Sequence, residues 1–341
     1  MEKRLKVALV VDVENWAYAN IARHFKREIS EFDIEIIPMS KLEGNVALMW
    51  LMCQDCDVVH FFCRGLAISY LGGDLKAAVA AYGGNTEEFI AEYIRPRLIT
   101  TCVYDHLFLG DDVDFTKLLF SEIENYYVSS EKLSEIYSAL GLTYAPRCVI
   151  TDGTDLEAFY PKNIERLKST EGRKVVVGWV GNSEWVGNTD DYKGVHTVIK
   201  PAVEALAKEG YEIELFTSDR VNKIIPIDEM VDYYAKIDVY VCASKAEGTP
   251  NPALESMACG IPVISTDVGV IPQLFGEKQK SLILEERSVE CLKGKLKMLL
   301  DNRSLFTELS SENLESIKKW EWKYKAEDFK NFILDAWSRR S

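Results

Sequence analysis

Residues 247–269 read EGTPNPALESMACGIPVISTDVG, and this stretch decides how the second half of the chain folds. Asn251 is a favourable N-cap and Pro252 suits the first helical position, so the sequence predicts a helix that begins there. Gly260 is expected to end that helix. The apolar run IPVIST that follows is typical of a buried strand. The stretch therefore predicts a loop, a short helix and a strand of a parallel sheet.

Two carboxylates stand eight positions apart in this stretch, Glu247 in the loop and Glu255 within the expected helix. The start of a helix carries unpaired amides and a partial positive charge, which suits a phosphate group. The amides of residues 248, 249, 251 and 253 are expected at this helix end. Taken alone, the two acids are equally compatible with ordinary surface groups. The whole pattern favours a ligand site.

Length and composition indicate a two-domain globular protein. The chain has 341 residues, of which 47% are hydrophobic and 28% charged. A formal net charge of -14 disfavours nucleic-acid partners and a polybasic membrane dock. No apolar run approaches the roughly 18 residues of a membrane span, and the first apolar segment is too short for a signal peptide. We expect a cytoplasmic protein without a transmembrane segment, and peripheral membrane contact stays open.

Cysteines and acid pairs are the candidates in this sequence for metal or redox sites. The pair Cys53-x-x-Cys56 lacks a second pair or nearby histidines, so we expect the eight cysteines to be reduced structural thiols. Three acid pairs fall in polar loops and are interpreted as solvated acids: Asp12-x-Glu14, Asp112-x-Asp114 and Asp190-Asp191. The sequence therefore predicts neither a metal site nor a metal cofactor.

Apolar runs alternate with helical patterns along the whole chain, which predicts βαβ units and parallel sheets. The expected fold class is α/β, with two Rossmann-like, doubly wound parallel-sheet domains facing each other across a cleft. Three segments are expected: an N-terminal domain over 1–156, a C-terminal domain over 157–318, and a helix over 319–341 that crosses back to the first domain. Ligands in such sheets bind at the carboxyl ends of the strands.

Several short motifs follow one another along this alternation of strands and helices. They are Asp57-Val58-Val59-His60, Asp152-Gly153-Thr154-Asp155, Phe159-Tyr160-Pro161, Lys193-Gly194, the Glu247-x7-Glu255 pair with its flanking glycines and prolines, and Trp320 onward. Each is weak alone, but the order and spacing together are specific. On these motifs the chain resembles the retaining glycosyltransferases of the GT-B fold, in particular glycosyltransferase family 4.

The resemblance implies transfer of a sugar from a UDP- or GDP-sugar to a hydroxyl acceptor, with retention and without a metal. The acceptor is a glycan, a lipid-linked molecule or a small molecule, and the expected context is glycan or cell-surface polysaccharide synthesis. The resemblance also implies that Glu247 holds donor-sugar hydroxyls and that Glu255 holds the ribose. Lys193 would then neutralise the leaving diphosphate. A lysine beside a helix N-terminus agrees with that role physically.

The candidate residues fall into three groups. Catalytic candidates are Glu247, Lys193 and His106. Donor-binding candidates are Gly181, Asn182, Lys193, Glu247, Gly248, Thr249, Pro250, Asn251 and Glu255. Acceptor-side candidates are Asn15, Trp16, Tyr104 and Asp105.

The chain departs from the family pattern in three places. The arginine that usually accompanies the lysine is missing from the loop Gly181–Glu184, and Arg64 or Arg220 could supply positive charge instead. The first loop, residues 12–16, is not glycine-rich. Tyr104-Asp105 occupies the place of the family's His-Asp, with His106 just after it.

Two other readings within the GT-B fold remain open, a sugar-nucleotide epimerase and a nucleotide-sugar-binding protein without catalysis. A dinucleotide oxidoreductase is poorly supported, since neither domain carries G-x-G-x-x-G after its first strand.

Overall fold

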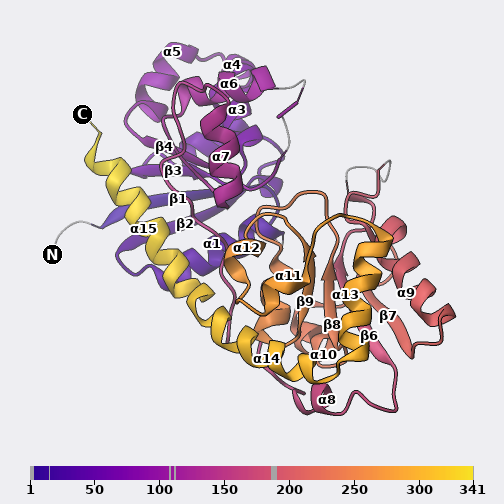
Figure 1. Cartoon of the computed structure of the whole chain (residues 1–341). Helices are drawn as coiled ribbons and strands as arrows, with labels where there is room; N and C mark the ends of the chain where they lie inside the picture. The colour runs from indigo at the N-terminus through magenta and orange to yellow at the C-terminus, as the bar shows by residue number, and fades with distance from the viewer. Residues whose placement is uncertain (1–3, 15, 107–108, 111–112, 186–189, 341) are drawn as a thin grey trace. The chain divides into compact units, whose positions relative to one another are not determined.

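The computed structural model describes residues 4–14, 16–106, 109–110, 113–185 and 190–340. It divides into two compact units, and each contains one parallel five-stranded sheet with helices (Figure 1). The first unit comprises Met1–Asp152 with Trp322–Ser341, and the second comprises Gly153–Glu321. This confirms the predicted α/β class with two Rossmann-like domains. The sequence placed the corresponding boundaries after residues 156 and 318.

The first unit is built on a sheet with the strand order β2-β1-β3-β4-β5. Its strands are β1 (Leu5–Val11), β2 (Phe32–Pro38), β3 (Val58–Phe61), β4 (Leu98–Val103) and β5 (Asn125–Val128). All pairings are parallel, and β1 pairs with β2 on one side and β3 on the other. Val7 to Val11 are all buried, as expected for a parallel strand covered on both faces. The strand expected at residues 147–151 is only an isolated bridge between Val149 and Val128.

Helices connect these strands. They are α1 (Ala17–Glu28), α2 (Val46–Met52), α3 (Arg64–Leu71), α4 (Gly73–Ala81), α5 (Thr86–Phe89), α6 (Val113–Glu122) and α7 (Glu131–Ala139), with short turns η1 (Met39–Lys41) and η2 (Ile90–Ile94). α3 and α4 are separate helices, because the backbone of Gly72 between them leaves the helical region at φ -110° and ψ -138°.

The C-terminal helix α15 (Trp322–Ser338) belongs to the first unit and packs against α1. Phe329 stacks on Phe25 with ring centroids 4.3 Å apart, and Trp322 stacks on His24 at 4.5 Å. The apolar face of α15 thereby completes the core on the face of the sheet that α1 covers. In Figure 1, α15 is the yellow helix near the C-terminus.

His60 lies in the core of the first unit. Its ring is fully buried and stacks on Tyr127, and its Nδ1 lies 2.9 Å from Oγ1 of Thr100. Burial lowers the pKa of His60 to about 3, so the ring is neutral in the folded chain. The structure thus assigns His60 to packing.

The second unit has the strand order β10-β9-β8-β6-β7. Its strands are β6 (Val175–Gly181), β7 (Ile213–Asp219), β8 (Val239–Cys242), β9 (Val263–Thr266) and β10 (Ile283–Leu284). All pairings are parallel. The chain enters the sheet at β6, moves outward to β7 and then returns past β6 to β8. The order of strands therefore reverses between β6 and β8.

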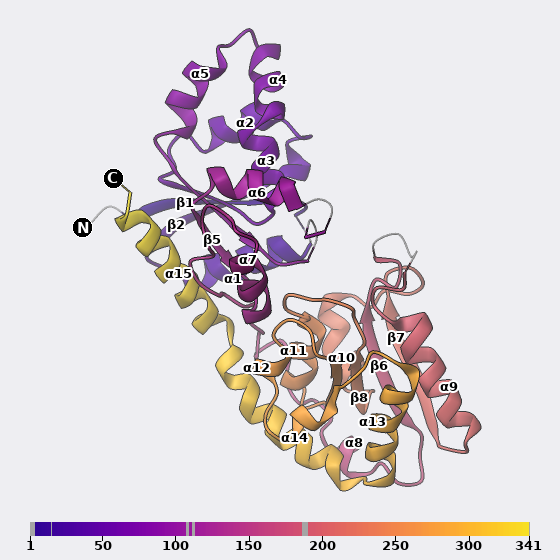
Figure 2. The same ribbon diagram turned by 45° about the horizontal axis from the view of Figure 1, so that its top comes forward.

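Helices cover both faces of this sheet. They are α8 (Glu165–Lys168), η4 (Val195–Ile199), α9 (Lys200–Lys208), η5 (Ile227–Glu229), α10 (Met230–Tyr234), α11 (Asn251–Ala258), α12 (Ile271–Leu274), η6 (Gln279–Leu282), α13 (Val289–Asp301), α14 (Ser304–Ser316) and η7 (Ile317–Trp320). Because crossovers between parallel strands are right-handed, reversing direction at β6 puts α9 on one face and α10 and α11 on the other. α9 packs against α13, and α11 packs against α14 (Figure 2).

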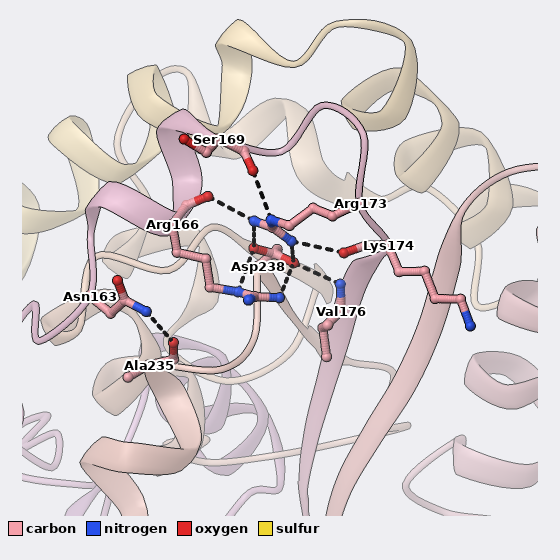
Figure 3. Close-up of polar contacts among 8 residues, drawn as sticks. All are labelled: Asn163, Arg166, Ser169, Arg173, Lys174, Val176, Ala235 and Asp238. Atoms are coloured by element: carbon pink, nitrogen blue, oxygen red, sulfur yellow. Dashed lines mark hydrogen bonds and ion pairs between the residues drawn. The ribbon is translucent and has the colours of Figure 1, made fainter.

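A buried carboxylate fixes the polar segment that precedes β6. Asp238, just ahead of β8, is fully buried and accepts a hydrogen bond from the Val176 amide at 2.8 Å. The guanidinium groups of Arg173 and Arg166 also donate to it, at 2.7 and 3.1 Å (Figure 3). A buried carboxylate is stable only when paired and hydrogen-bonded in this way. The segment that carries Arg166 and Arg173 is thus a packed part of the second unit at the amino end of its sheet.

The two connections between the units run side by side. The Thr154 amide donates to the Trp320 carbonyl at 2.8 Å, and Thr154 and Glu321 form a parallel bridge.

All eight cysteines are free thiols. Within the described part of the chain, no helix is both long enough and apolar enough to cross a membrane. The cytoplasmic location remains a prediction.

Candidate functional site

The reversal of strand order in the second unit creates the setting for a ligand site. The connections that leave the carboxyl ends of β6 and β8 diverge there, and ligands of doubly wound sheets bind in the crevice so formed. The described part of the loop after β6 comprises residues 182–185 and 190–194, and the loop after β8 covers residues 243–250. The candidates Lys193 and Glu247 lie on these two loops.

The two loops are joined to each other by backbone and charge. The Lys245 amide donates to the Tyr192 carbonyl at 2.9 Å. The Lys245 side chain forms an ion pair with Asp190. Asp190 and Asp191 were interpreted as solvated acids. Asp190 is half of this ion pair, and Asp191 is buried.

Gly194 allows the closest approach between the loops. Its φ is +76°, a conformation that glycine adopts without steric cost. A Cβ atom at this position would lie 2.4 Å from the Ala243 carbonyl oxygen and 2.8 Å from the Ala243 Cβ. The Lys193-Gly194 pair thus has a structural reason: the glycine lets the loop that carries Lys193 contact the loop that carries Glu247.

Asp191 starts the helix that follows. Its carboxylate accepts hydrogen bonds from the amides of Val195 and Thr197, at 3.1 and 2.6 Å, and from the Thr197 hydroxyl at 2.7 Å. Its own φ is +37°, which costs on the order of 1 kcal/mol in a residue with a Cβ. The predicted helix over 194–208 is present, as the π-turn η4 followed by α9. Asp191 therefore fixes the backbone two residues before Lys193.

Lys193 and Glu247 meet between the loops. Lys193 Nζ lies 2.6 Å from Glu247 Oε1, although the residues are 54 positions apart. The Ser244 hydroxyl donates to the same oxygen at 2.6 Å. The two side chains remain 19% and 17% exposed, so the pair is shielded but still reachable from solvent. Lys193 Nζ also lies 5.8 Å from the ring centre of the half-exposed Trp185.

The helix that follows Glu247 begins one residue earlier than predicted. α11 starts at Asn251, with Pro250 as the N-cap, so the assignment of Asn251 as the N-cap is wrong. The side-chain oxygen of Asn251 is buried and has no hydrogen-bond partner among the described residues. The Ala253 amide donates to the Pro250 carbonyl at 2.8 Å. That amide, one of four expected to be open to a ligand, is thus already used within the turn.

The turn before α11 rests on the loop after β9. The Val270 amide donates to the Gly248 carbonyl at 3.1 Å. Gly269 has φ +48°, and a Cβ there would lie 1.9 Å from the Gly248 oxygen. Gly248, Thr249 and Pro250 are thereby held at the carboxyl edge of the sheet, directly after Glu247.

Glu255 projects from α11 toward α10. The Tyr234 hydroxyl donates to Glu255 Oε2 at 2.6 Å. Burial raises the pKa of Glu255 to about 7, although the Tyr234 hydrogen bond acts in the opposite direction. A carboxylate with this pKa gains from further hydrogen-bond donors, such as the hydroxyls of a diol.

Gly181 and Asn182 lie where β6 ends. Gly181 pairs with Asp219 of β7, and its carbonyl accepts from the Arg220 amide at 2.9 Å. The Asn182 side-chain oxygen accepts from the Glu184 amide at 3.1 Å and so shapes its own loop. Arg220, considered as a source of positive charge, therefore follows β7 at the same edge of the sheet as Lys193.

The first unit holds the acceptor-side candidates. The ring of Tyr104 lies 5.6 Å from that of Tyr18, and its hydroxyl is 3.1 Å from the Tyr127 hydroxyl. Its role toward an acceptor stays a prediction. Burial raises its pKa well above the usual value. Trp16 precedes α1 and is 48% exposed, whereas Asn15 lies outside the described residues.

Asp105 and His106 follow β4 in the first unit, and both are half-buried. Arg64 Nη2 lies 2.6 Å from Asp105 Oδ1, and the arginine is 3% exposed. Arg64, the other candidate source of positive charge, is thus paired within its own unit. The roles of Asp105 and His106 stay predictions.

Three residues of the second-unit site were not identified from the sequence. Ser244 holds Glu247, Tyr234 holds Glu255, and Arg287 contacts both loops. Arg287 Nε donates to the Ala243 carbonyl at 2.8 Å, and its Nη2 donates to the Asp191 carbonyl at 2.5 Å. Ser244 and Arg287 follow strands β8 and β10. The rule that carboxyl ends share one edge could have pointed to both.

Solved structures identify the fold of the whole chain. Sucrose-phosphate synthase from Thermosynechococcus elongatus superposes with a TM-score of 0.71 at 14% identity, over 99% of this chain and 100% of that one. HepE from Anabaena, in complex with UDP and glucose, gives 0.70 at 12% identity, over 97% and 100%. At these identities the similarity establishes the fold, which is GT-B.

Residues 175–302, within the second unit, match the family described as "Glycosyl transferases group 1". The chain has the GT-B fold, and its residues 175–302 resemble the group 1 glycosyltransferases. This confirms the resemblance that the motifs indicated at the level of fold and family. The matched residues include Lys193, Glu247 and Glu255, so the candidate site lies inside the glycosyltransferase domain.

Curated relatives named as glycosyltransferases align with parts of this chain. The putative teichuronic acid biosynthesis glycosyltransferase TuaC of Bacillus subtilis is 32% identical over 103 residues, 30% of this chain and 24% of that protein. The N,N'-diacetylbacillosaminyl-diphospho-undecaprenol alpha-1,3-N-acetylgalactosaminyltransferase of Campylobacter jejuni is 22% identical over 204 residues, 55% of this chain and 54% of that protein. The aligned stretches thus span about a quarter to about half of these relatives' length.

The first prediction concerns the close approach at Gly194. We expect Gly194→Ala to lower the free energy of unfolding by roughly 3 kcal/mol or more, because it adds a clash with Ala243 to a strained φ. Gly210→Ala is the matched control: φ is +93°, but nothing lies within 4 Å of the added atom, so about 1 kcal/mol is expected. Urea denaturation measures both. Equal losses would contradict the assigned contact.

The second prediction concerns Glu255. Between pH 4.5 and about 7 the folded chain keeps a proton that the unfolded chain releases, so this residue lowers stability as the pH rises through that window. Glu255→Gln lacks this loss. We expect it to be more stable than the wild type by roughly 1–3 kcal/mol at pH 8, with little gain at pH 5. Urea denaturation at both pH values tests this. The exposed Glu212→Gln should show no such difference, and an equal gain at both pH values would rule out the assignment.

Proposed function

We propose that the protein is a retaining glycosyltransferase that moves a sugar from a UDP- or GDP-sugar to a hydroxyl acceptor. One observation carries the proposal. Lys193 and Glu247, from loops 54 residues apart, meet 2.6 Å from each other at the carboxyl edge of the second sheet, just before the N-terminus of α11. A cation, a carboxylate and a helix start together suit a nucleotide sugar, which presents both a diphosphate and sugar hydroxyls.

Lys193 and the start of α11 are assigned to the diphosphate. Departure of a nucleoside diphosphate builds negative charge on the β-phosphate, and nearby fixed positive groups stabilise that charge. Lys193 forms an ion pair with Glu247. Arrival of a diphosphate gives the lysine a second anionic partner and leaves Glu247 able to accept hydrogen bonds from sugar hydroxyls.

Glu255 is assigned to the ribose. Glu255 lies on α11, the helix that follows the loop of Glu247, and its carboxylate already accepts a hydrogen bond from the Tyr234 hydroxyl. A carboxylate repels phosphate, whereas a diol offers two hydroxyl donors. The spacing of Glu247 and Glu255 across the start of α11 therefore matches the order sugar, diphosphate, ribose along a donor.

Acceptor recognition is assigned to the first unit, with Trp16, Asp105 and His106 as candidates. In a retaining transfer by the front face, the bond from the anomeric carbon to the diphosphate oxygen breaks. The acceptor oxygen then forms the new bond on the same side, and its proton passes to the departing phosphate. This scheme needs no separate protein nucleophile. It relies on positioning and charge stabilisation.

The names of relatives support glycan or cell-surface polysaccharide synthesis as the context. They include the teichuronic acid enzyme and the undecaprenol-linked sugar transferase described above, and a lipopolysaccharide core mannosyltransferase of Rhizobium meliloti. A sugar-nucleotide epimerase and a binding protein without catalysis are not favoured by these comparisons.

The third prediction tests the site. A thermal-shift panel of UDP, GDP, ADP, TDP and CMP identifies the nucleotide, since a ligand of the folded state raises the midpoint. Transfer from the matching sugar nucleotides is then followed by mass spectrometry.

Lys193→Met and Glu247→Gln should each lower turnover more than tenfold while the fold is retained. The exposed Lys208→Met is the control. Turnover close to wild type in both site variants would rule out the assignment.

The fourth prediction concerns metals. Because Lys193 and the start of α11 supply positive charge to the diphosphate, transfer should proceed at an unchanged rate after removal of divalent cations. Turnover measured with excess EDTA, and again after Mg²⁺ or Mn²⁺ is restored, tests this. A loss with EDTA that either cation reverses would show that the charge comes from a metal.

A further inference from the structure

We propose that Arg287 is a positioning residue that holds Lys193 in register with Glu247, so that the lysine can meet the donor's β-phosphate. The inference rests on the proposed function. It adds a residue that the sequence motifs do not contain, carried by a third segment of the second unit.

Arg287 links two backbone carbonyls on opposite sides of the crevice. Its Nε donates to the Ala243 oxygen at 2.8 Å, and its Nη2 donates to the Asp191 oxygen at 2.5 Å. Ala243 directly follows β8, and Asp191 precedes Lys193 by two residues. The planar guanidinium group fixes the separation and direction of its donors. Arg287 thus sets the distance between the peptide before Lys193 and the strand end that leads to Glu247.

The position of Arg287 in the sheet explains how it reaches both loops. It follows β10, the outer strand, and the order β10-β9-β8-β6 places its two targets across the carboxyl edge. β9 separates β10 from β8, so the long side chain spans from one side of the crevice to the other. A shorter residue at 287 could not make both contacts.

The contacts fall where the loop backbone is most constrained. Asp191 has φ +37°, and its carbonyl also accepts from the Gly194 amide at 2.9 Å. Ala243 is the residue that Gly194 touches. Arg287 therefore stabilises the conformation in which Asp191 is strained and Gly194 lies against Ala243. Loss of this link is expected to free the peptide that carries Lys193.

Precise placement matters because Lys193 acts through one charged atom. A charge-assisted hydrogen bond changes affinity by roughly 10- to 100-fold and weakens steeply as its geometry worsens, so a displacement of about 1 Å removes much of it. The effect should be confined to the diphosphate, because Glu255 and Tyr234 lie on separate helices that Arg287 does not touch. A positioning role thus makes a different prediction from a general loss of stability.

The fifth prediction compares nucleotides that differ by one phosphate. Dissociation constants for UDP and UMP, and for GDP and GMP, are measured by calorimetry on the full chain. We expect the wild type to prefer the matching diphosphate by roughly 10- to 100-fold, the effect of one charge-assisted hydrogen bond. Arg287→Met should lose most of that preference while its monophosphate affinity stays within about threefold. Arg287→Lys should be intermediate, since one ammonium cannot donate in the same fork.

A double mutant separates positioning from direct binding. If Arg287 acts through Lys193, the variant with both Lys193→Met and Arg287→Met should bind diphosphate no more weakly than Lys193→Met alone. Arg339→Met, an exposed change just after the end of α15, serves as the control. If Arg287→Met does not fold, Arg287→Lys carries the same comparison.

The outcomes separate the two claims. A wild type without any diphosphate preference would overturn the proposed function and this inference together. A wild type with the preference and an Arg287→Met variant that retains it would overturn the inference and leave the proposed function in place. Additive losses in the double mutant would also overturn it, because they would show that Arg287 does not act through Lys193.

Discussion

The contact between Gly194 and the Ala243 carbonyl is the constraint on which the site in the second unit depends. It presses the loop after β6 onto the loop after β8, at the point where strand order reverses. Parallel strands aim their following loops at one edge, but they do not bring two diverging loops into contact. Gly194 permits that contact because it has no side chain. Hydrogen bonds of Asp191, Lys245 and Arg287 then hold the two loops together. The ion pair between Lys193 and Glu247 is a consequence of this arrangement.

Several residues in the same region adopt conformations or environments that are unfavourable for folding. Asp191 adopts a left-handed backbone, the half-buried Glu255 has its pKa raised to about 7, and Asn251 keeps a buried oxygen without a partner among the described residues. Each feature is unfavourable for folding alone. They gather within the domain that matches the group 1 glycosyltransferases. Such clustering is typical of sites that are prepared for a ligand.

Much of this could be predicted from the sequence, for identifiable reasons. Alternating apolar runs predict two parallel sheets, and the spacing of Glu247, Glu255 and Lys193 carries the family pattern. The start of α11 was predicted one residue too late, because Asn251, a favoured N-cap type, instead forms the first residue of the helix and its side chain makes no capping hydrogen bond. The role of Arg287 could not be predicted, since it depends on how far a side chain from β10 reaches across the edge. Whether Tyr104 faces a ligand or packs was equally hidden, because that depends on Tyr18 and Tyr127, which are remote in sequence.

We propose that the carboxyl edge of the second sheet binds a donor diphosphate between Lys193 and the start of α11. A crystal structure of the chain with the nucleoside diphosphate selected by thermal shift tests this directly. We expect the β-phosphate within hydrogen-bonding distance of Lys193 Nζ, and the ribose hydroxyls on Glu255. A nucleotide bound elsewhere, or bound at this edge with its phosphates turned away from Lys193, would contradict it.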